Sequence, residues 1–311
     1  MKNKHQIRIN PETCIGCGLC RKDCPAGNIR IKDKKAKVIT QDCIMCGHCV
    51  AICPKAAVSM TGFEEPPEEI EKPSALDPGE LLRAIKTRRS IRQFTKRRVE
   101  PELIAQIIEA GRLTPTGGNA QNVSFIVLND RLESAEKLAV GLFRRLLPLM
   151  KLVNPIARRM SIDDHFFFKK APAAIVIVAP SQVDGALAAA NMELMAEACG
   201  LGVLYSGFFS MAANWSRPLR RLLGLKRKER AVTTLVLGYS AVNYRRTAQK
   251  EKGRRPNYLS QVIDSGPRLS PWAWAFFCLV IPGAGEVCGR WGNVDGLRRS
   301  LWSNIAILAI G

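Results

Sequence analysis

The amino-acid sequence predicts an α+β protein with a small cysteine-rich domain, followed by a larger domain in which helices pack on a mixed sheet. Three observations support this prediction. Eight of the eleven cysteines fall in one short stretch near the N-terminus. An acidic, proline-rich segment without apolar periodicity follows that stretch. Beyond it, segments with helical and with strand-like apolar spacing follow each other.

The length of the chain is consistent with this division, because 311 residues with 47% apolar side chains fill two domains more comfortably than one. We place the cysteine-rich domain at residues 1–61 and an extended acidic linker at 62–77. The larger domain is expected at 78–256, followed by an atypical C-terminal extension at 257–311.

Two cysteine runs with the same internal spacing form the most specific motif of the chain. They are Cys14-x2-Cys17-x2-Cys20-x3-Cys24-Pro25 and Cys43-x2-Cys46-x2-Cys49-x3-Cys53-Pro54. Two residues between thiolates let a tight loop offer three sulfurs to one cubane, while the fourth cysteine, followed by proline, points to the other cluster. We therefore expect two [4Fe-4S] clusters. Their expected ligands are Cys14, Cys17, Cys20 and Cys53 for the first, and Cys43, Cys46, Cys49 and Cys24 for the second.

Other interpretations of the cysteines are weaker. Zinc ribbons use paired C-x2-C units that lie well apart. Disulfides are disfavoured because neighbouring thiols are too crowded to pair and the N-terminal residues lack the apolar core of a signal peptide. Free thiols suit a reducing cytosol, so we expect a cytoplasmic protein. His48 lies inside a cluster loop, where no ligand pattern requires it, and we expect it to face solvent or the ligands' surroundings.

The net charge of +20 invites a nucleic-acid interpretation, which we do not favour. Each oxidised four-iron cluster with its thiolates carries a charge of about −2, which lowers the total. The remaining positive charge is concentrated in three segments, at residues 83–98, 217–230 and 245–255. Local basic patches also suit an anionic cofactor or an acidic electron-transfer partner.

The first basic segment has the composition of a phosphate site. A helix is expected to start near Pro78 and to lead into Arg88-Arg89-Ser90-Ile91-Arg92, with no acidic residue between Leu81 and Val99. Guanidinium groups and a hydroxyl at a helix end can donate hydrogen bonds to phosphate oxygens. A nucleic-acid or plain surface patch is the alternative for the same residues.

A second candidate segment is a loop of small and amide residues. A helix with proline at its start is expected at Pro101–Gly111, and a strand at Ser124–Leu128. The loop between them, residues 113–122, can offer backbone N–H groups and amide side chains to a planar heterocycle. By itself it would be an ordinary turn.

The order of these segments resembles the nitroreductase family of FMN proteins. Later segments agree with it: a buried strand at 173–179, a helix at 184–199, the segment 203–208 and a central strand at 231–237. This resemblance covers about residues 78 to 256. The N-terminal stretch, about residues 5 to 60, resembles bacterial dicluster ferredoxins. A ferredoxin-like module ahead of a nitroreductase-like domain is a known arrangement in that family.

The resemblance implies FMN as a third cofactor and assigns residues to it. The FMN phosphate and ribityl chain would be held by Arg88, Ser90 and Arg92, with Arg89 beside them and Arg245 or Arg246 closing on the phosphate. The flavin would be lined by Pro115, Thr116, Gly117, Asn119 and Gln121. Its redox edge would be approached by Tyr205, Ser206 and Gly207. Two departures from the family pattern, Gly117-Gly118 and Asn122-Val123, suggest altered phosphate-side hydroxyls and an altered substrate face.

The function implied is an iron–sulfur flavoprotein oxidoreductase. Electrons would pass from a low-potential donor, ferredoxin-like or a reduced nicotinamide, through both clusters to FMN and on to a small nitroaromatic- or quinone-like acceptor. No general acid or nucleophile is needed, so catalysis is assigned to the flavin and to no catalytic side chain. The resemblance also implies a homodimer. The alternative is a ferredoxin-like electron-transfer subunit of a larger redox complex, without a substrate of its own.

Several features are given plain structural interpretations. Cys199 is expected in the core and His165 on a helix surface, and the basic segment 143–159 is expected in a mobile substrate cover. The apolar stretch 272–281 is too short for a membrane span. The extension that contains it is interpreted as non-functional, with membrane contact as the alternative.

Overall fold

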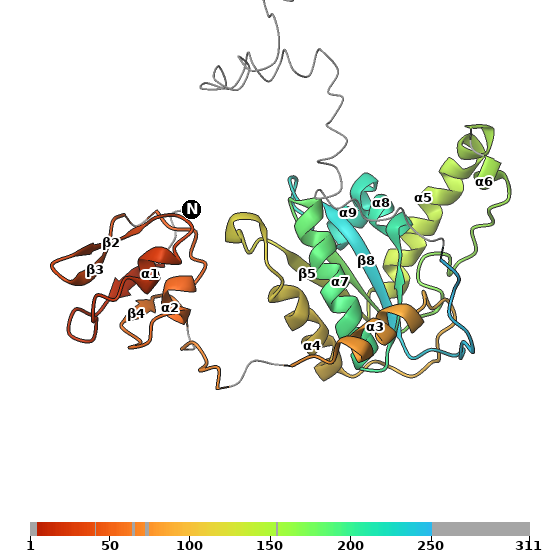
Figure 1. Cartoon of the computed structure of the whole chain (residues 1–311). Coiled ribbons are helices and arrows are strands. Elements are labelled where there is room, and N and C mark those ends of the chain that lie inside the picture. Colours follow the sequence, from red (N-terminus) through yellow and green to blue (C-terminus); the bar gives the residue numbers. More distant parts are fainter. Residues whose placement is uncertain (1–4, 41, 64–65, 72–74, 154, 251–311) are drawn as a thin grey trace, which may run out of the picture. The chain divides into compact units, whose positions relative to one another are not determined.

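The computed structural model describes residues 5–40, 42–63, 66–71, 75–153 and 155–250 (Figure 1). The predicted C-terminal extension, 257–311, and five residues of the predicted linker, 64–65 and 72–74, lie outside these described residues. Among the helices of the described part, none combines the length and the apolar character that crossing a membrane would require.

The cysteine-rich domain contains two small antiparallel sheets and two one-turn helices. β1 pairs with β4, and β2 pairs with β3. The strands are β1 Ile7–Ile9, β2 Ile29–Lys32, β3 Lys35–Val38 and β4 Val58–Met60, and the helices are α1 Leu19–Lys22 and α2 His48–Ala51. A two-residue turn joins β2 to β3, and both of its residues, Asp33 and Lys34, have positive φ, as the tightest hairpins require.

The internal repeat of the sequence is also a repeat of structure. α1 follows Gly18, whose φ is 80°, and α2 follows Gly47, whose φ is 76°. Side chains other than glycine rarely adopt this conformation, so both cysteine loops depend on glycine at the same place. The buried residues of this domain include three of the predicted ligands, Cys14, Cys20 and Cys49, beside a few aliphatic side chains.

The larger domain is built on a four-stranded sheet with the order β5-β6-β8-β7. Its strands are β5 Ser124–Leu128, β6 Ala173–Val178, β7 Gly202–Tyr205 and β8 Ala231–Gly238. All three ladders are antiparallel, and parallel pairing enters through a bridge between Ser90 and Val203. The predictions of a buried strand at 173–179 and a central strand at 231–237 are confirmed.

The helices of the larger domain are α3 Pro78–Thr87, α4 Pro101–Arg112, α5 Leu132–Val153, α6 Pro155–Arg158, α7 Gln182–Ala198, α8 Gly207–Trp215 and α9 Arg217–Leu222, with a short 3-10 helix, η1, at Gly117–Asn119. Of these, α5, α8 and α9 cover one face of the sheet, and α4 and α7 cover the other. α7 starts two residues before the predicted start at Asp184, because the Ser181 hydroxyl accepts a hydrogen bond from the Asp184 N–H and so caps the helix earlier. The predicted substrate cover, 143–159, comprises the second half of α5 and α6; its role stays a prediction.

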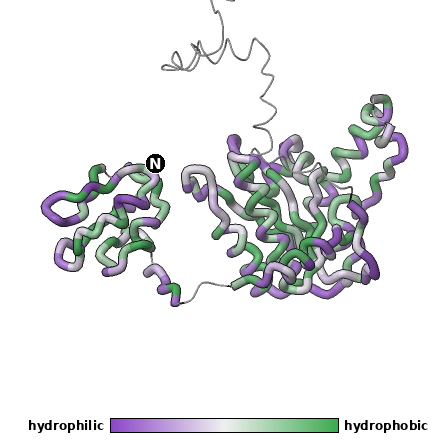
Figure 2. Tube along the Cα trace, in the orientation of Figure 1, coloured by the Kyte–Doolittle hydropathy of each residue, from purple (hydrophilic) through white to green (hydrophobic). Residues whose placement is uncertain are grey.

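Strand β6 packs against helices on both faces of the sheet. Ala174, Val176 and Val178 belong to the apolar cluster that contains residues of α5, α8 and α9. The intervening residues of β6 belong to the cluster on the other face, with Ile107 of α4 and Met192 of α7. Because both faces are covered, β6 is apolar throughout rather than alternating. Figure 2 shows this hydrophobic interior as green tube along the central strands.

One buried carboxylate holds the segment that leads into β6. Glu136 of α5 is 3% exposed and accepts hydrogen bonds from the backbone N–H groups of Phe167 and Phe168, at 3.1 and 2.8 Å. Nδ1 of His165 lies 3.4 Å from the other oxygen of Glu136. Burial raises the pKa of the Glu136 carboxyl, while the two N–H groups and His165 oppose this shift. The carboxylate therefore compensates two backbone donors that the core removes from water.

We predict that Glu136→Leu destabilises the larger domain by about 2–4 kcal/mol, because two buried N–H groups lose their acceptor. Glu136→Gln, which keeps a carbonyl acceptor, should cost clearly less. Thermal unfolding of the full chain, followed by far-UV circular dichroism, measures the difference. Glu133→Leu, an exposed position on the same helix, is the matched control. Equal melting temperatures for Glu136→Leu and this control would contradict the assignment.

Candidate cofactor sites

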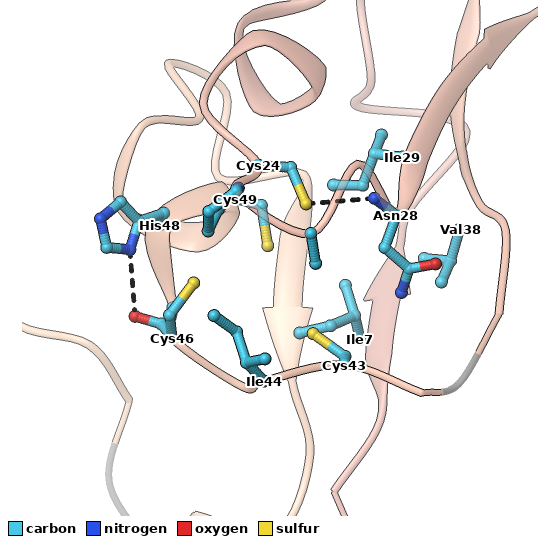
Figure 3. A pocket seen from close by; sticks show the side chains of 13 residues that line it. Ile7, Cys24, Asn28, Ile29, Val38, Cys43, Ile44, Cys46, His48 and Cys49 are labelled. Carbon is cyan, nitrogen blue, oxygen red and sulfur yellow. Dashed lines mark hydrogen bonds between the residues drawn. The ribbon is translucent and has the colours of Figure 1, made fainter. Parts of the chain in front are cut away.

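The four cysteines predicted to hold the second cluster line one cavity (Figure 3). Cys24 comes from the first cysteine run, and Cys43, Cys46 and Cys49 come from the second. Figure 3 shows their sulfur atoms turned toward the same space. The rest of the wall is mostly apolar, with Ile7, Ile29, Val38 and Ile44, and it also includes Asn28 and His48. Four sulfurs inside a mostly apolar wall suit a four-iron cluster.

The other four cysteines line a second cavity of the same kind. Cys14, Cys17 and Cys20 belong to the first run, and Cys53 belongs to the second. The fourth cysteine of each run thus crosses to the other set, because Pro25 and Pro54 turn the chain away after Cys24 and Cys53. Each cavity is lined by cysteines of one predicted ligand set, so the residues present fit two clusters.

Backbone N–H groups donate to sulfur in both cavities. In one, Asn28 N lies 3.3 Å from Cys24 Sγ. In the other, Ala57 N lies 3.3 Å from Cys53 Sγ. Met45 N to Cys43 Sγ and Ala36 N to Cys14 Sγ add one bond to each set, at 3.3 and 3.4 Å. Hydrogen bonds to the sulfurs stabilise the anionic state of a cluster and are one of the terms that set its reduction potential.

The pKa values of the thiols reflect the crowding of four sulfurs in a buried space. Burial, and then the charges of Cys43, Cys46 and Cys24, raise the pKa of Cys49 to about 11. Burial, with smaller effects from Cys53 and the other members of its set, raises the pKa of Cys20. A cluster binds thiolates, so its insertion must release these protons. His48 is exposed, its Nδ1 lies 3.4 Å from the Cys46 carbonyl oxygen, and its ring points away from the sulfur atoms (Figure 3).

In the larger domain, the predicted phosphate residues run alongside the start of β7. Ser90 forms the parallel bridge to Val203, and the Ile91 N–H donates to the Val203 carbonyl at 3.0 Å. Gly202 is required here, because a Cβ at that position would lie 2.5 Å from the Ile91 side chain. The bridge places Arg88–Arg92 close to the strand that ends at Tyr205, so two of the three predicted flavin segments are neighbours.

A single carboxylate connects those two segments. Glu193 of α7 forms an ion pair with Arg88 at 3.0 Å and accepts a hydrogen bond from the Tyr205 hydroxyl at 3.2 Å. The Glu193 side chain is 13% exposed and that of Arg88 is 31% exposed. Burial and then the Glu193 charge raise the pKa of Tyr205 above its ordinary value, so the phenol stays protonated and donates.

The predicted arginines do not share one partner. Arg92 is exposed and points a guanidinium N–H toward the Ser90 carbonyl oxygen at 3.4 Å. The Arg89 guanidinium lies over the Tyr244 ring at 5.3 Å. This contact brings the basic tail, with the exposed Arg245 and Arg246, toward the predicted phosphate segment. A concentration of guanidinium groups that keep open donors fits a phosphate.

The predicted flavin loop has an unusual backbone. Gly118, Asn119 and Gln121 have φ values of 58°, 54° and 46°. The Gln121 N–H donates to the Thr116 hydroxyl at 2.9 Å, and the Gln121 side-chain amide donates to the side-chain oxygen Oδ1 of Asn119 at 3.2 Å. These bonds hold the amide side chains of the loop in a defined arrangement, which is what recognition of a planar heterocycle would need.

Sequence reasoning missed the polar residues of α7. Asp184 accepts from the Gly117 N–H at 3.1 Å, and the Asn191 side chain donates to the Thr114 hydroxyl at 2.8 Å. Together with Glu193, they contact all three predicted flavin segments. The signal was the presence of charged and amide side chains in an otherwise Ala- and Met-rich helix, a pattern that identifies a helix lying in the interior but not its partners.

Comparison with known proteins agrees with this architecture. Residues 85–239 match the nitroreductase family, and residues 6–54 match the 4Fe-4S dicluster domain. A protein of Archaeoglobus fulgidus, assigned as an NADH dehydrogenase/NAD(P)H nitroreductase, is 30% identical over 171 residues, which are 51% of this chain and 85% of the relative. An FMN reductase [NAD(P)H] of Bacillus subtilis is 27% identical over 191 residues, 58% of this chain and 76% of the relative.

Solved structures of similar fold include nitroreductases with bound FMN. That of Bacteroides fragilis is 21% identical, with a TM-score of 0.48, over 58% of this chain and 98% of that chain. That of Desulfitobacterium hafniense is 22% identical, with a TM-score of 0.49, over 58% and 97%. The chain belongs to the nitroreductase family. The predicted class, a nitroreductase-like FMN-dependent oxidoreductase with a dicluster domain, is confirmed.

The crossed arrangement of the cysteines makes a prediction about iron content. Cys14→Ala combined with Cys53→Ala should remove one cluster and leave about four irons, because both residues line the same cavity. Cys24→Ala combined with Cys53→Ala should disturb both clusters. Iron analysis and electron paramagnetic resonance of anaerobically reduced protein measure this, with Cys199→Ala as the control. One intact cluster in Cys43→Ala combined with Cys53→Ala would refute the crossed sets.

Proposed function

We propose that the chain is an iron–sulfur flavoprotein oxidoreductase. It passes electrons from a low-potential donor through two [4Fe-4S] clusters to FMN and on to a small organic acceptor of nitroaromatic or quinone type. The observation that carries the proposal is the occurrence, in one chain, of a nitroreductase-family domain and two cavities that are each lined by four cysteines. The proposed ligands are the two crossed cysteine sets, and the proposed domain limits are those of the sequence analysis.

The protein's own residues bind and orient the cofactors in this proposal. Arg88, Ser90 and Arg92, with Arg89 and one of Arg245 and Arg246, donate to the FMN phosphate and ribityl oxygens. The loop of Pro115, Thr116, Gly117, Asn119 and Gln121 lines the ring, and Tyr205, Ser206 and Gly207 lie at its redox edge. The first turn of α8, which begins at Gly207, offers backbone N–H groups that lack helical partners. FMN, when bound, supplies the exchange between single electrons and a two-electron hydride equivalent.

Two classes of donor suit the proposal. The similar proteins carry NAD(P)H in their names, which supports a reduced nicotinamide. The dicluster domain supports a ferredoxin-like protein that delivers single electrons. Cluster cysteines need a reducing compartment, so the proposal includes a cytoplasmic location.

The surface of α3 supports a homodimer. The helix is strongly amphipathic in sequence, yet Leu81, Leu82 and Ile85 are 39%, 64% and 49% exposed. Its side chains other than Ala84 are exposed, and although α3 touches α7, much of the apolar face stays open to solvent among the described residues. An apolar helix face left in water indicates an interaction surface. We propose that a second copy of the chain covers it.

The phosphate assignment predicts the behaviour of one double variant. Arg88→Ala combined with Arg92→Ala should lose FMN and keep iron, because two guanidinium donors to the phosphate are removed while both cysteine sets stay intact. Wild-type protein should hold near eight irons and about one FMN per chain. Iron, sulfide and heat-released flavin are measured in one anaerobic preparation.

The matched control is Arg217→Ala combined with Arg221→Ala, two exposed arginines of α9. It should retain wild-type flavin and iron. Full flavin occupancy in the Arg88 and Arg92 variant would defeat the phosphate assignment. Wild-type protein with full iron but no flavin, even after FMN is supplied, would leave an electron-transfer subunit and remove the enzyme proposal.

The dimer proposal predicts the effect of a charge on α3. Leu82→Glu should shift the protein from dimer to monomer by at least about tenfold in dissociation constant, because a carboxylate would be buried without a partner. Light scattering coupled to size-exclusion chromatography measures the mass. Lys86→Glu, an exposed change on the same helix, tests for a general charge effect. An unchanged mass for Leu82→Glu across a dilution series would show that α3 lies outside the interface.

A further inference from the structure

The segment 114–121 of the predicted flavin loop, residues 113–122, includes residues whose backbone conformation L-amino acids avoid. Asn119 and Gln121 both have positive φ, at 54° and 46°. In this region Cβ crowds the following carbonyl oxygen, so the conformation persists only where surrounding contacts enforce it. The enforcing contacts that lie outside the loop are therefore part of the site.

Asp184 supplies one such contact. Its Oδ1 accepts a hydrogen bond from the Gly117 N–H at 3.1 Å, across 67 residues of sequence. Asp184 is 7% exposed, and it lies in the first turn of α7, where the N–H groups of the helix favour a negative charge. A buried carboxylate bonded to a backbone N–H is a strong, charge-assisted contact. It fixes the entry to η1, just ahead of the residues with positive φ.

Asn191 supplies a second contact from the same helix. Its side-chain amide donates to the Thr114 hydroxyl at 2.8 Å, and that hydroxyl donates in turn to the Ala110 carbonyl oxygen at 2.9 Å. Asp184 and Asn191 are separated by two helical turns and so lie on the same side of α7. The helix thus holds the beginning and the middle of the loop at two fixed points.

We infer that Asp184, with Asn191 as a second anchor, is a positioning residue that holds loop 114–121 in its flavin-binding conformation. This inference rests on the proposed FMN site. Asp184 acts through Gly117 and not on the cofactor, because its accepting oxygen is occupied by the loop and a buried carboxylate would repel the phosphate. The ligand class is an anionic flavin nucleotide, whose ring would contact the loop on its open side.

The test compares FMN binding by the full, iron-loaded chain and its variants. Asp184→Ala should raise the FMN dissociation constant by about tenfold, which is the loss of affinity expected when a charge-assisted hydrogen bond that organises the loop is removed. Asp184→Asn keeps an acceptor oxygen and should restore binding to within about threefold of wild type. Asp130→Ala, an exposed carboxylate after β5, should leave binding unchanged.

A spectroscopic readout separates positioning from simple instability. The visible circular dichroism of bound FMN reports the surroundings of the ring, so it should change in Asp184→Ala and return in Asp184→Asn while far-UV circular dichroism and iron content stay constant. If Asp184→Ala does not fold, Asn191→Ala replaces it, since Asn191 is exposed and its truncation leaves no cavity; binding should weaken about threefold.

The outcomes distinguish the inference from the function on which it rests. If wild-type protein binds no FMN, the proposed function fails and the inference fails with it. If wild type binds FMN, but Asp184→Ala and Asn191→Ala bind it with the same affinity and the same visible circular dichroism, the positioning role alone is overturned. Weakened binding that Asp184→Asn does not restore also overturns it, because the acceptor oxygen would then be irrelevant.

Discussion

The hydrogen-bonding requirement of the polar side chains on α7 organises the larger domain around its candidate site. A carboxylate in the interior needs donors, and a helix that has already satisfied its own backbone cannot provide them except at its first turn. Asp184 and Glu193 therefore take donors from other segments, the N–H of Gly117, the guanidinium of Arg88 and the hydroxyl of Tyr205. Three segments that are distant in sequence are brought to one helix for this reason.

The cysteine-rich domain depends on a different constraint. It is too small to bury a large apolar core, and its buried residues include cysteines whose thiols are costly to crowd together. Such a domain gains most of its folding free energy from the inorganic groups that it binds. Its short strands and one-turn helices serve to place sulfur atoms, with left-handed glycines before each helix and prolines after each run.

The chain's excess of positive charge matters for both kinds of cofactor site. The segment from Arg83 to Arg98 contains no acidic residue, and the partners of its paired arginines, Glu80, Glu100 and Glu193, lie outside it. Four-iron clusters with their thiolates and the FMN phosphate carry negative charge, so basic residues near them are electrostatically favourable. Glu193 forms an ion pair with Arg88 and so fixes its position, whereas Arg92, Arg245 and Arg246 are exposed.

The sequence by itself determined the α+β class and the buried and central strands, because these follow from local spacing and composition, and the order of its motifs led to the nitroreductase family by resemblance. The cysteine spacing also led to the crossed ligand sets, whose members line separate cavities. Only the tertiary structure decided the partners of Asp184, Asn191 and Glu193 and the bridge from Ser90 to Val203. Those contacts join residues far apart in the chain, and a polar side chain in an apolar helix shows that a partner must exist without showing which one.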